Sequence, residues 1–159
     1  MKLYLVQHGD AVDRTVDPDR PLSEQGVHDV KAIAGVLRAA GIRVDRVWHS
    51  GKHRAGQTAA ILAGVIAPSM TVEPVDGIRP NDAVAVFAED ADVWDQDTLV
   101  VGHLPFMARL VSLLVTGDPE QQLVNYSPGS VVCLERRATH WIVSWMLRPD
   151  MFADRAGDA

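Results

Sequence analysis

KLYLVQHGD, residues 2–10, joins a short apolar strand directly to a histidine and a glycine. The strand is predicted over residues 2–6, so His8 falls just beyond its carboxyl end. In an open α/β sheet, ligands bind at the carboxyl ends of the strands. A lone histidine at such an end is more often a packed or capping residue, so a functional role for His8 depends on what other segments bring to the same edge.

Strand-like and helix-like segments alternate along the rest of the chain. Further strands are predicted over residues 44–49, 71–75, 98–101, 130–134 and 140–147. Helices are predicted from the N-cap Ser23 to Gly41, over 52–66, after Asn81 or Asp82 as a cap, and from Pro105 to residue 115 with Gly117 at the end. This alternation predicts an α/β fold, a three-layer α/β/α sandwich with a mostly parallel central sheet and helices on both faces.

The last two strands are predicted to form a hairpin. Residues 136–139 supply a polar turn between residues 130–134 and 140–147. Alternation along the second strand predicts that one face carries Trp141, Val143, Trp145 and Leu147. We expect these tryptophans to belong to the core.

Composition limits the class of protein. The chain has 159 residues, of which 47% are hydrophobic and 23% charged, which suits one globular domain over residues 1–150 followed by a flexible tail over 151–159. The net charge of -6, with no run of Lys or Arg, disfavours nucleic acid and anionic membrane as partners. Cys133 is the only cysteine, so a disulfide framework or thiolate metal cluster within one chain is excluded.

The chain shows no targeting signal. Polar residues interrupt the apolar start of the sequence, and no apolar run approaches the length that spans a membrane. We therefore expect a cytoplasmic protein.

Basic and imidazole side chains follow three of the predicted strands. His8 follows the first, Ser50, Lys52 and Arg54 follow the strand over 44–49, and His103 follows the strand over 98–101. The carboxyl ends of parallel strands share one edge of the sheet. Arg54 falls near the start of a helix, where unpaired N–H groups and the helix dipole favour an anion, and a guanidinium grips phosphate oxygens in bidentate fashion. This combination predicts a phosphate site.

The order of these segments resembles the histidine phosphatase superfamily, and within it the SixA-type phosphohistidine phosphatases. The segments are a strand followed by His-Gly, then Ser50 with Arg54-Ala55 and Gln57-Thr58, then Gly102-His103 with Pro105. The stretch Asp19-Arg20-Pro21-Leu22 followed by Gly26 also resembles SixA-type members. The likeness covers roughly residues 2–115, and the spaced combination is far more specific than any single motif.

The resemblance implies a phosphoglycerate mutase-like fold without a large cap insertion. It implies that His8 is the nucleophile and attacks phosphorus to form a phosphohistidine, which water then hydrolyses. It also implies that Arg54 and His103 hold the phosphoryl oxygens. No cofactor and no metal are implied. The expected partner is a phosphorylated protein bearing phosphohistidine, or a small phosphorylated substrate. His8 must attack as neutral imidazole, so its other ring nitrogen should donate to a backbone carbonyl.

Two positions depart from the family's motifs. Gln7 stands where the first motif has arginine, and Gly51 stands where the second has proline. Loss of a guanidinium removes a charge and a planar pair of donors, so weakened catalysis is one expectation. Lys52 and Arg20 are candidate compensating cations.

The phosphate pocket is completed by residues with smaller expected roles. Gln7, Gly9 and Ser50 join Arg20 and Lys52 as candidate substrate-binding residues. No general acid is assigned. Asp76 is the nearest carboxylate to the place of a family glutamate, Asp82 is a candidate helix cap, and Asp10 is a candidate for orienting the first loop.

Two other functions fit the same residues. In one, the chain is a phosphate-binding or phosphoprotein-binding module with little or no catalysis, because Gln7 replaces the arginine. In the other, His8, Asp10, His49, His53 and His103 bind zinc or manganese in a metal-dependent hydrolase. The second ranks lowest because no His-x-x-x-His pair lies on a predicted helix, and His49 and His53 are better explained as polar loop residues.

Overall fold

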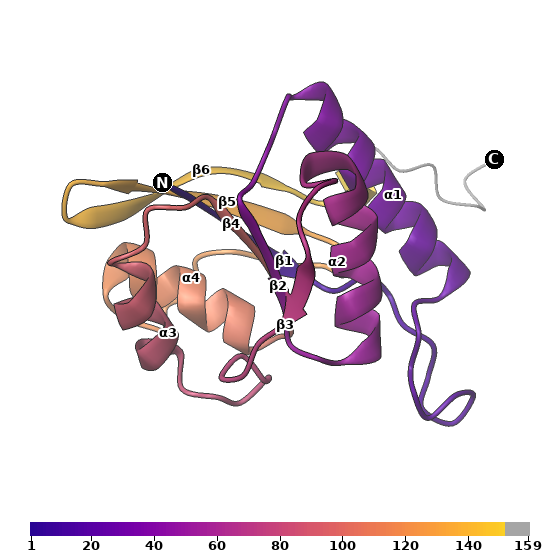
Figure 1. Ribbon diagram of the computed structural model, residues 1–159. Coiled ribbons are helices and arrows are strands. Elements are labelled where there is room, and N and C mark those ends of the chain that lie inside the picture. Colours follow the sequence, from indigo (N-terminus) through magenta and orange to yellow (C-terminus); the bar gives the residue numbers. More distant parts are fainter. Residues whose placement is uncertain (152–159) are drawn as a thin grey trace.

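A computed structural model describes residues 1–151 and contains one six-stranded sheet (Figure 1). The strands are β1 Lys2–Gln7, β2 Arg46–His49, β3 Val72–Pro74, β4 Thr98–Gly102, β5 Val131–Arg137 and β6 His140–Leu147. The helices are α1 Glu24–Ala39, α2 His53–Ile66, α3 Val84–Ala91 and α4 Phe106–Thr116, and a short 3-10 turn covers Pro149–Met151. The strand order is β3-β2-β4-β1-β5-β6, and β5 alone runs opposite to the other strands, because it pairs antiparallel with both β1 and β6.

The helices form a layer on each side of the sheet, as predicted. Helices α1 and α2 cover one face, and α3 and α4 cover the other (Figure 1). Strand β1 shows why, because its side chains alternate between the two faces. Tyr4 and Val6 pack in the core beneath α1 and α2, whereas Leu3 and Leu5 pack beneath α3 and α4. A central strand buried on both faces therefore reads as a continuous apolar run.

The topology gathers four chain segments at one edge of the sheet. Strands β2 and β1 both pair in parallel with β4, so the residues after all three strands lie at their shared carboxyl edge. Strand β5 runs the opposite way, and the residues that precede it reach the same edge. There the backbone N–H of Gln7 donates to the carbonyl of Ser130, and the N–H of Gly129 donates to that of Gln7.

The predicted single face of β6 is wrong. Cys133 pairs with Trp145 and Leu134 pairs with Val143, so Ser144 is an extra residue that forms a bulge. A slip of one residue moves the following side chains to the opposite face. Trp145 and Leu147 accordingly pack with the core beneath α1 and α2, whereas Trp141 packs with the core beneath α3 and α4.

The predicted capping of α3 by Asn81 or Asp82 is also wrong. The helix begins at Val84 with Ala83 as its N-cap, and no side chain caps it. The Asp82 carboxylate instead accepts a hydrogen bond from the backbone N–H of Arg79, at 2.8 Å. Short acidic side chains close local turns as readily as they cap helices, so sequence alone does not separate the two roles.

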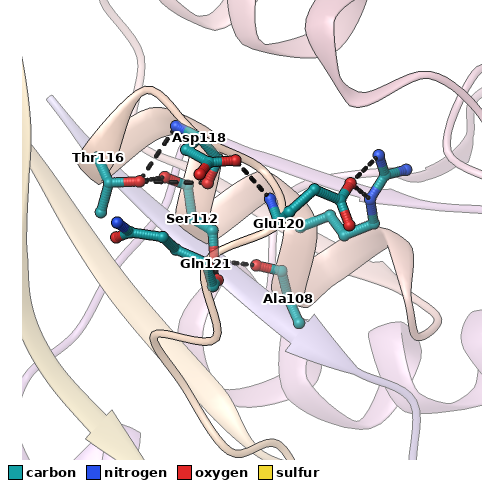
Figure 2. A network of polar contacts seen from close by, with 7 residues as sticks. Ala108, Ser112, Thr116, Asp118, Glu120 and Gln121 are labelled. Atoms are coloured by element: carbon teal, nitrogen blue, oxygen red, sulfur yellow. Dashed lines mark hydrogen bonds and ion pairs between the residues drawn. The ribbon is translucent and has the colours of Figure 1, made fainter.

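Other predicted helix ends are confirmed. The hydroxyl of Ser23 caps α1 by accepting from the N–H of Gly26, and Gly117 ends α4 in the left-handed conformation. Beyond α4, the chain returns toward the carboxyl edge of the sheet and is held by a polar network (Figure 2). In it, the hydroxyl of Ser112 donates to the carbonyl of Gln121, and Arg109 pairs with Glu120 at 2.7 Å.

Residues 152–159 lie outside the described part of the chain, and with them nearly all of the predicted tail, whose first residue, Met151, belongs to the 3-10 turn. None of the helices within residues 1–151 is long and apolar enough to cross a membrane.

Candidate active site

His8 follows β1 at the carboxyl edge of the sheet, and its ring has one defined tautomer. Its Nδ1 lies 2.7 Å from the carbonyl oxygen of Gly9. A carbonyl only accepts, so Nδ1 carries the proton and Nε2 keeps its lone pair. The predicted hydrogen bond to a backbone carbonyl is thereby confirmed. Burial is the main cause that lowers the pKa of His8 below its usual value, and it outweighs the Gly9 hydrogen bond, so the ring is neutral at pH 7.

Arg54, in the first turn of α2, directs its guanidinium at the lone pair of His8. Its Nε donates to His8 Nε2 at 3.3 Å. The pKa of Arg54 is lowered by burial and by the charges of Arg20 and Arg14, which shows that positive charges converge on this edge. An incoming anion would relieve this repulsion.

His103 lies against His8 and is almost completely buried. The two ring centroids are 4.9 Å apart, and the Nε2 of His103 is 2.5 Å from the hydroxyl oxygen of Ser50. Burial, followed by the influence of His8 and Arg54, lowers the pKa of His103 to about 3. Its Nδ1 is buried without a hydrogen-bond partner among residues 1–151. His103 is therefore a neutral imidazole that lies beside His8 and hydrogen-bonds to Ser50.

Two residues that the sequence analysis left without a role hold the His8 loop in place. Thr58 is fully buried, and its hydroxyl accepts from the N–H of Gly9 at 3.0 Å while donating to the carbonyl of Arg54 at 2.8 Å. Gln57 accepts from the N–H of Leu22 at 2.7 Å. The Gln-Thr part of the second motif was the signal for both, because it accompanies the arginine in the family.

Close backbone packing also fixes this loop. A Cβ on Gly26 would lie 2.1 Å from the carbonyl oxygen of Asp10, and a Cβ on Gly9 would lie 2.8 Å from Cγ2 of Val30. The carboxylate of Asp10 binds the start of α1, because it accepts a hydrogen bond from the hydroxyl of the N-cap Ser23 at 2.6 Å. Asp10 therefore orients the first loop, as predicted.

Gln7 contributes an unusual group to this edge. Its side-chain Oε1 is buried and has no hydrogen-bond partner within residues 1–151. The backbone of Gln7 contacts Ser130, in a segment where Ser127 and Ser130 hydrogen-bond to each other at 3.0 Å. This segment was not predicted to neighbour the pocket, because residue types do not reveal which way β5 runs.

Arg20 and Lys52, the two candidate compensating cations, are placed differently. Arg20 adopts a left-handed backbone, with φ of 47°, and its Nε donates to the carbonyl of Val12 at 3.2 Å. Its positive charge helps to lower the pKa of His8. Lys52 is exposed at the N-cap of α2, and its charge helps to lower the pKa of His103.

Gly51 has a conformation that the family's proline cannot adopt. Its φ is +84°, whereas proline is fixed near −65°, and its N–H donates to Nδ1 of His49 at 3.1 Å. His49 is thereby engaged in a turn, and His53 is exposed at the start of α2. Within residues 1–151 no three His, Cys, Asp or Glu side chains are grouped as metal ligands, so the geometry does not favour a metal-dependent hydrolase.

Comparisons with known proteins agree with this arrangement. The model of the histidine phosphatase superfamily (branch 1) matches residues 3–83. An uncharacterized protein of Picosynechococcus is 30% identical over 146 residues, which is 87% of each chain. The phosphohistidine phosphatase SixA of Escherichia coli is 24% identical over 154 residues, which is 94% of each.

Solved structures share the fold. The protein histidine phosphatase SixA complexed with tungstate superimposes with a TM-score of 0.84 at 22% identity, covering 95% of this chain and 99% of that one. The α-ribazole phosphatase of Shigella flexneri has a TM-score of 0.70 at 14% identity, with 90% and 94% covered. These likenesses confirm the expected phosphoglycerate mutase-like fold.

Proposed function

Because the chain belongs to the histidine phosphatase superfamily, we propose that it is a phosphatase that removes the phosphoryl group from phosphohistidine in proteins. The observation that carries the proposal is the state of His8. Its Nδ1 donates to the Gly9 carbonyl, so the lone pair of Nε2 is available and lies beside Arg54. A neutral, oriented imidazole next to a fixed guanidinium suits attack on phosphorus.

The reaction proceeds in two steps. The lone pair of His8 Nε2 forms a bond to phosphorus as the bond from phosphorus to the substrate's ring nitrogen breaks. The substrate's second ring nitrogen takes a proton from water beforehand, so the electron pair of the broken bond stays on the first nitrogen and the substrate leaves as neutral imidazole. Water then attacks phospho-His8, which releases inorganic phosphate and restores Nε2. Arg54, His103 and Ser50 supply donors for the phosphoryl oxygens, which carry the charge in the transition state.

No carboxylate is needed as a dedicated acid for this leaving group. The second ring nitrogen of phosphohistidine can be protonated before the P–N bond breaks, whereas an ester oxygen depends more on an acid in the site. Among the candidates, Asp10 and Asp82 accept hydrogen bonds in loops, and Asp76 lines a hollow beside Ser50. This distribution favours phosphohistidine over a phosphate ester.

Arg20 is the best candidate to replace the charge that Gln7 lacks. Its Nε is tied to the Val12 carbonyl, and the neighbouring pairing of Ala11 with Leu22 closes the loop that carries it. Its charge reaches both His8 and Arg54. Lys52 adds a second cation at the mouth of the pocket. Gln7 and Gly9 then line the pocket as smaller contributors.

One observation favours the binding module as a second candidate function. The buried Oε1 of Gln7 is an acceptor, and a phosphoryl oxygen placed near it would be repelled rather than held. In that case phosphate binds, held by Arg54 and His103, and turnover is slow or absent.

Turnover separates the two functions. The wild-type protein, His8→Ala and His8→Asn are assayed on a protein carrying phosphohistidine and on an aryl phosphate, with and without chelator. If the protein is a phosphatase, we expect the wild type to release phosphate in the presence of chelator and neither variant to release any. Phosphate release that is equal in wild type and His8→Ala contradicts the proposal, and binding of the phosphoprotein without release supports the binding module.

A further inference from the structure

A second hollow adjoins the pocket through Ser50. It has a volume of about 390 Å³ and is lined by Ser50 and Lys52, which precede α2, and by Asp76 and Arg79, in the segment after β3. The hydroxyl of Ser50 is also the one that contacts His103. A substrate held at His8 is therefore within reach of this hollow.

The hollow presents two cations that have no partner among the described residues. Lys52 and Arg79 are exposed, and within residues 1–151 neither side chain makes a hydrogen bond or an ion pair. Asp76, the one carboxylate of the lining, is also exposed and does not pair with them. The lining therefore carries a net charge of about +1 in a chain whose net charge is -6.

Arg79 is held in position by its backbone. Ile78 beside it is completely buried in the core beneath α3 and α4. The N–H of Arg79 donates to the Asp82 carboxylate at 2.8 Å, and the N–H of Asp82 donates to the Arg79 carbonyl at 3.1 Å. A guanidinium presented from a fixed turn loses less entropy when it binds than one on a free loop.

We propose that this hollow is a recognition subsite for an acidic side chain that the substrate protein carries close to its phosphohistidine. Arg79 binds the carboxylate in bidentate fashion, and Lys52 adds a second positive charge. Asp76 limits the subsite to a singly charged group, because it repels a dianion such as a second phosphate. The inference rests on the proposed function, since it names which phosphohistidine proteins this site prefers.

Paired peptides test the subsite. Two phosphohistidine peptides differ only in Glu or Gln at the flanking position, and kcat/KM is measured for each with wild type, Arg79→Ala and Arg79→Glu. Arg43→Ala is the matched control, because Arg43 is exposed at the opposite edge of the sheet and, within residues 1–151, its side chain hydrogen-bonds to nothing but the Ile42 carbonyl. We expect wild type and Arg43→Ala to prefer the Glu peptide about fivefold, Arg79→Ala to show no preference and Arg79→Glu to prefer Gln.

The same ratio measured by binding separates this inference from the proposed function. Calorimetry uses peptides with a non-hydrolysable phosphotriazole in place of phosphohistidine. In one outcome, neither phosphohistidine peptide is hydrolysed, but the wild type binds the Glu analogue about fivefold tighter than the Gln analogue and Arg79→Ala does not. That outcome supports the subsite and contradicts the proposed phosphatase activity. An equal ratio in wild type and Arg79→Ala overturns the subsite. A preference for free phosphohistidine over its carboxamide, without one among peptides, overturns the assignment to a protein side chain.

Discussion

Thr58 is predicted to hold the nucleophile in place although it touches no substrate. Its buried hydroxyl accepts from the N–H of Gly9, and the carbonyl of Gly9 in turn fixes the tautomer of His8. Thr58→Val keeps the shape of the side chain and removes the hydroxyl. The N–H of Gly9 is then left buried without its acceptor, which costs about 1–3 kcal/mol.

Two measurements report this loss. A cost near 2 kcal/mol lowers the midpoint of thermal unfolding by about 4–8 °C in a domain of this size. Because the Gly9 carbonyl shifts with its N–H, His8 loses orientation, and kcat should fall about 10- to 100-fold with a smaller change in KM. Thr58→Ser retains the hydroxyl and serves as the control, so it should keep kcat near that of the wild type. Unchanged Tm and kcat in Thr58→Val would show that the hydroxyl does not hold the His8 loop.

Three further perturbations, two substitutions and a change of pH, test other features of the site and the fold. Gln7→Arg adds a guanidinium to a site whose missing charge Arg20 already supplies, so it should raise kcat/KM on phosphohistidine protein by less than about 10-fold; a larger rise would mean that Arg20 does not replace the charge. The pKa of His8 is lowered by burial, so the acid limb of the kcat/KM profile should lie below pH 6.5. The lowered pKa values also make the free energy of unfolding decrease as the pH is lowered below about 6.5. His8 and His103 are protonated in the unfolded chain there, whereas folded His103 stays neutral down to about pH 3. A free energy of unfolding that increases as the pH is lowered from 6.5 to 5 would contradict this. Gly26→Ala places a Cβ 2.1 Å from the Asp10 carbonyl and should destabilise by about 3 kcal/mol, whereas Gly35→Ala in the same helix, with open space around it, should stabilise slightly; equal unfolding midpoints would contradict the close approach.

Much of the site could be predicted because its chemistry follows three strands. His8, Arg54 and His103 each come directly after a strand or at the start of a helix, and parallel pairing through β4 brings these positions to one edge. Local signals were enough for that step. The hydrogen bond from His8 to a backbone carbonyl was also predictable, because a neutral nucleophile needs a donor proton on its other nitrogen.

Features that depend on pairing or on competing turns were not predictable. The bulge at Ser144 reverses the faces of β6, and only the register against β5 reveals it. Asp82 closes a turn with Arg79 because that local bond forms in place of a helix cap. The approach of Ser130 to Gln7 depends on the direction of β5, which residue types do not encode.

Whether His8 is the nucleophile is decided by finding where the phosphoryl group is attached during turnover. The protein is mixed with phosphohistidine substrate, quenched within one turnover, and the phosphorylated residue and its isomer are identified by mass spectrometry and NMR. Because Nδ1 donates to Gly9, we expect transient phosphate on Nε2 of His8, and none in His8→Ala. Phosphate on Nδ1, on another residue, or on no residue while substrate is hydrolysed would contradict it.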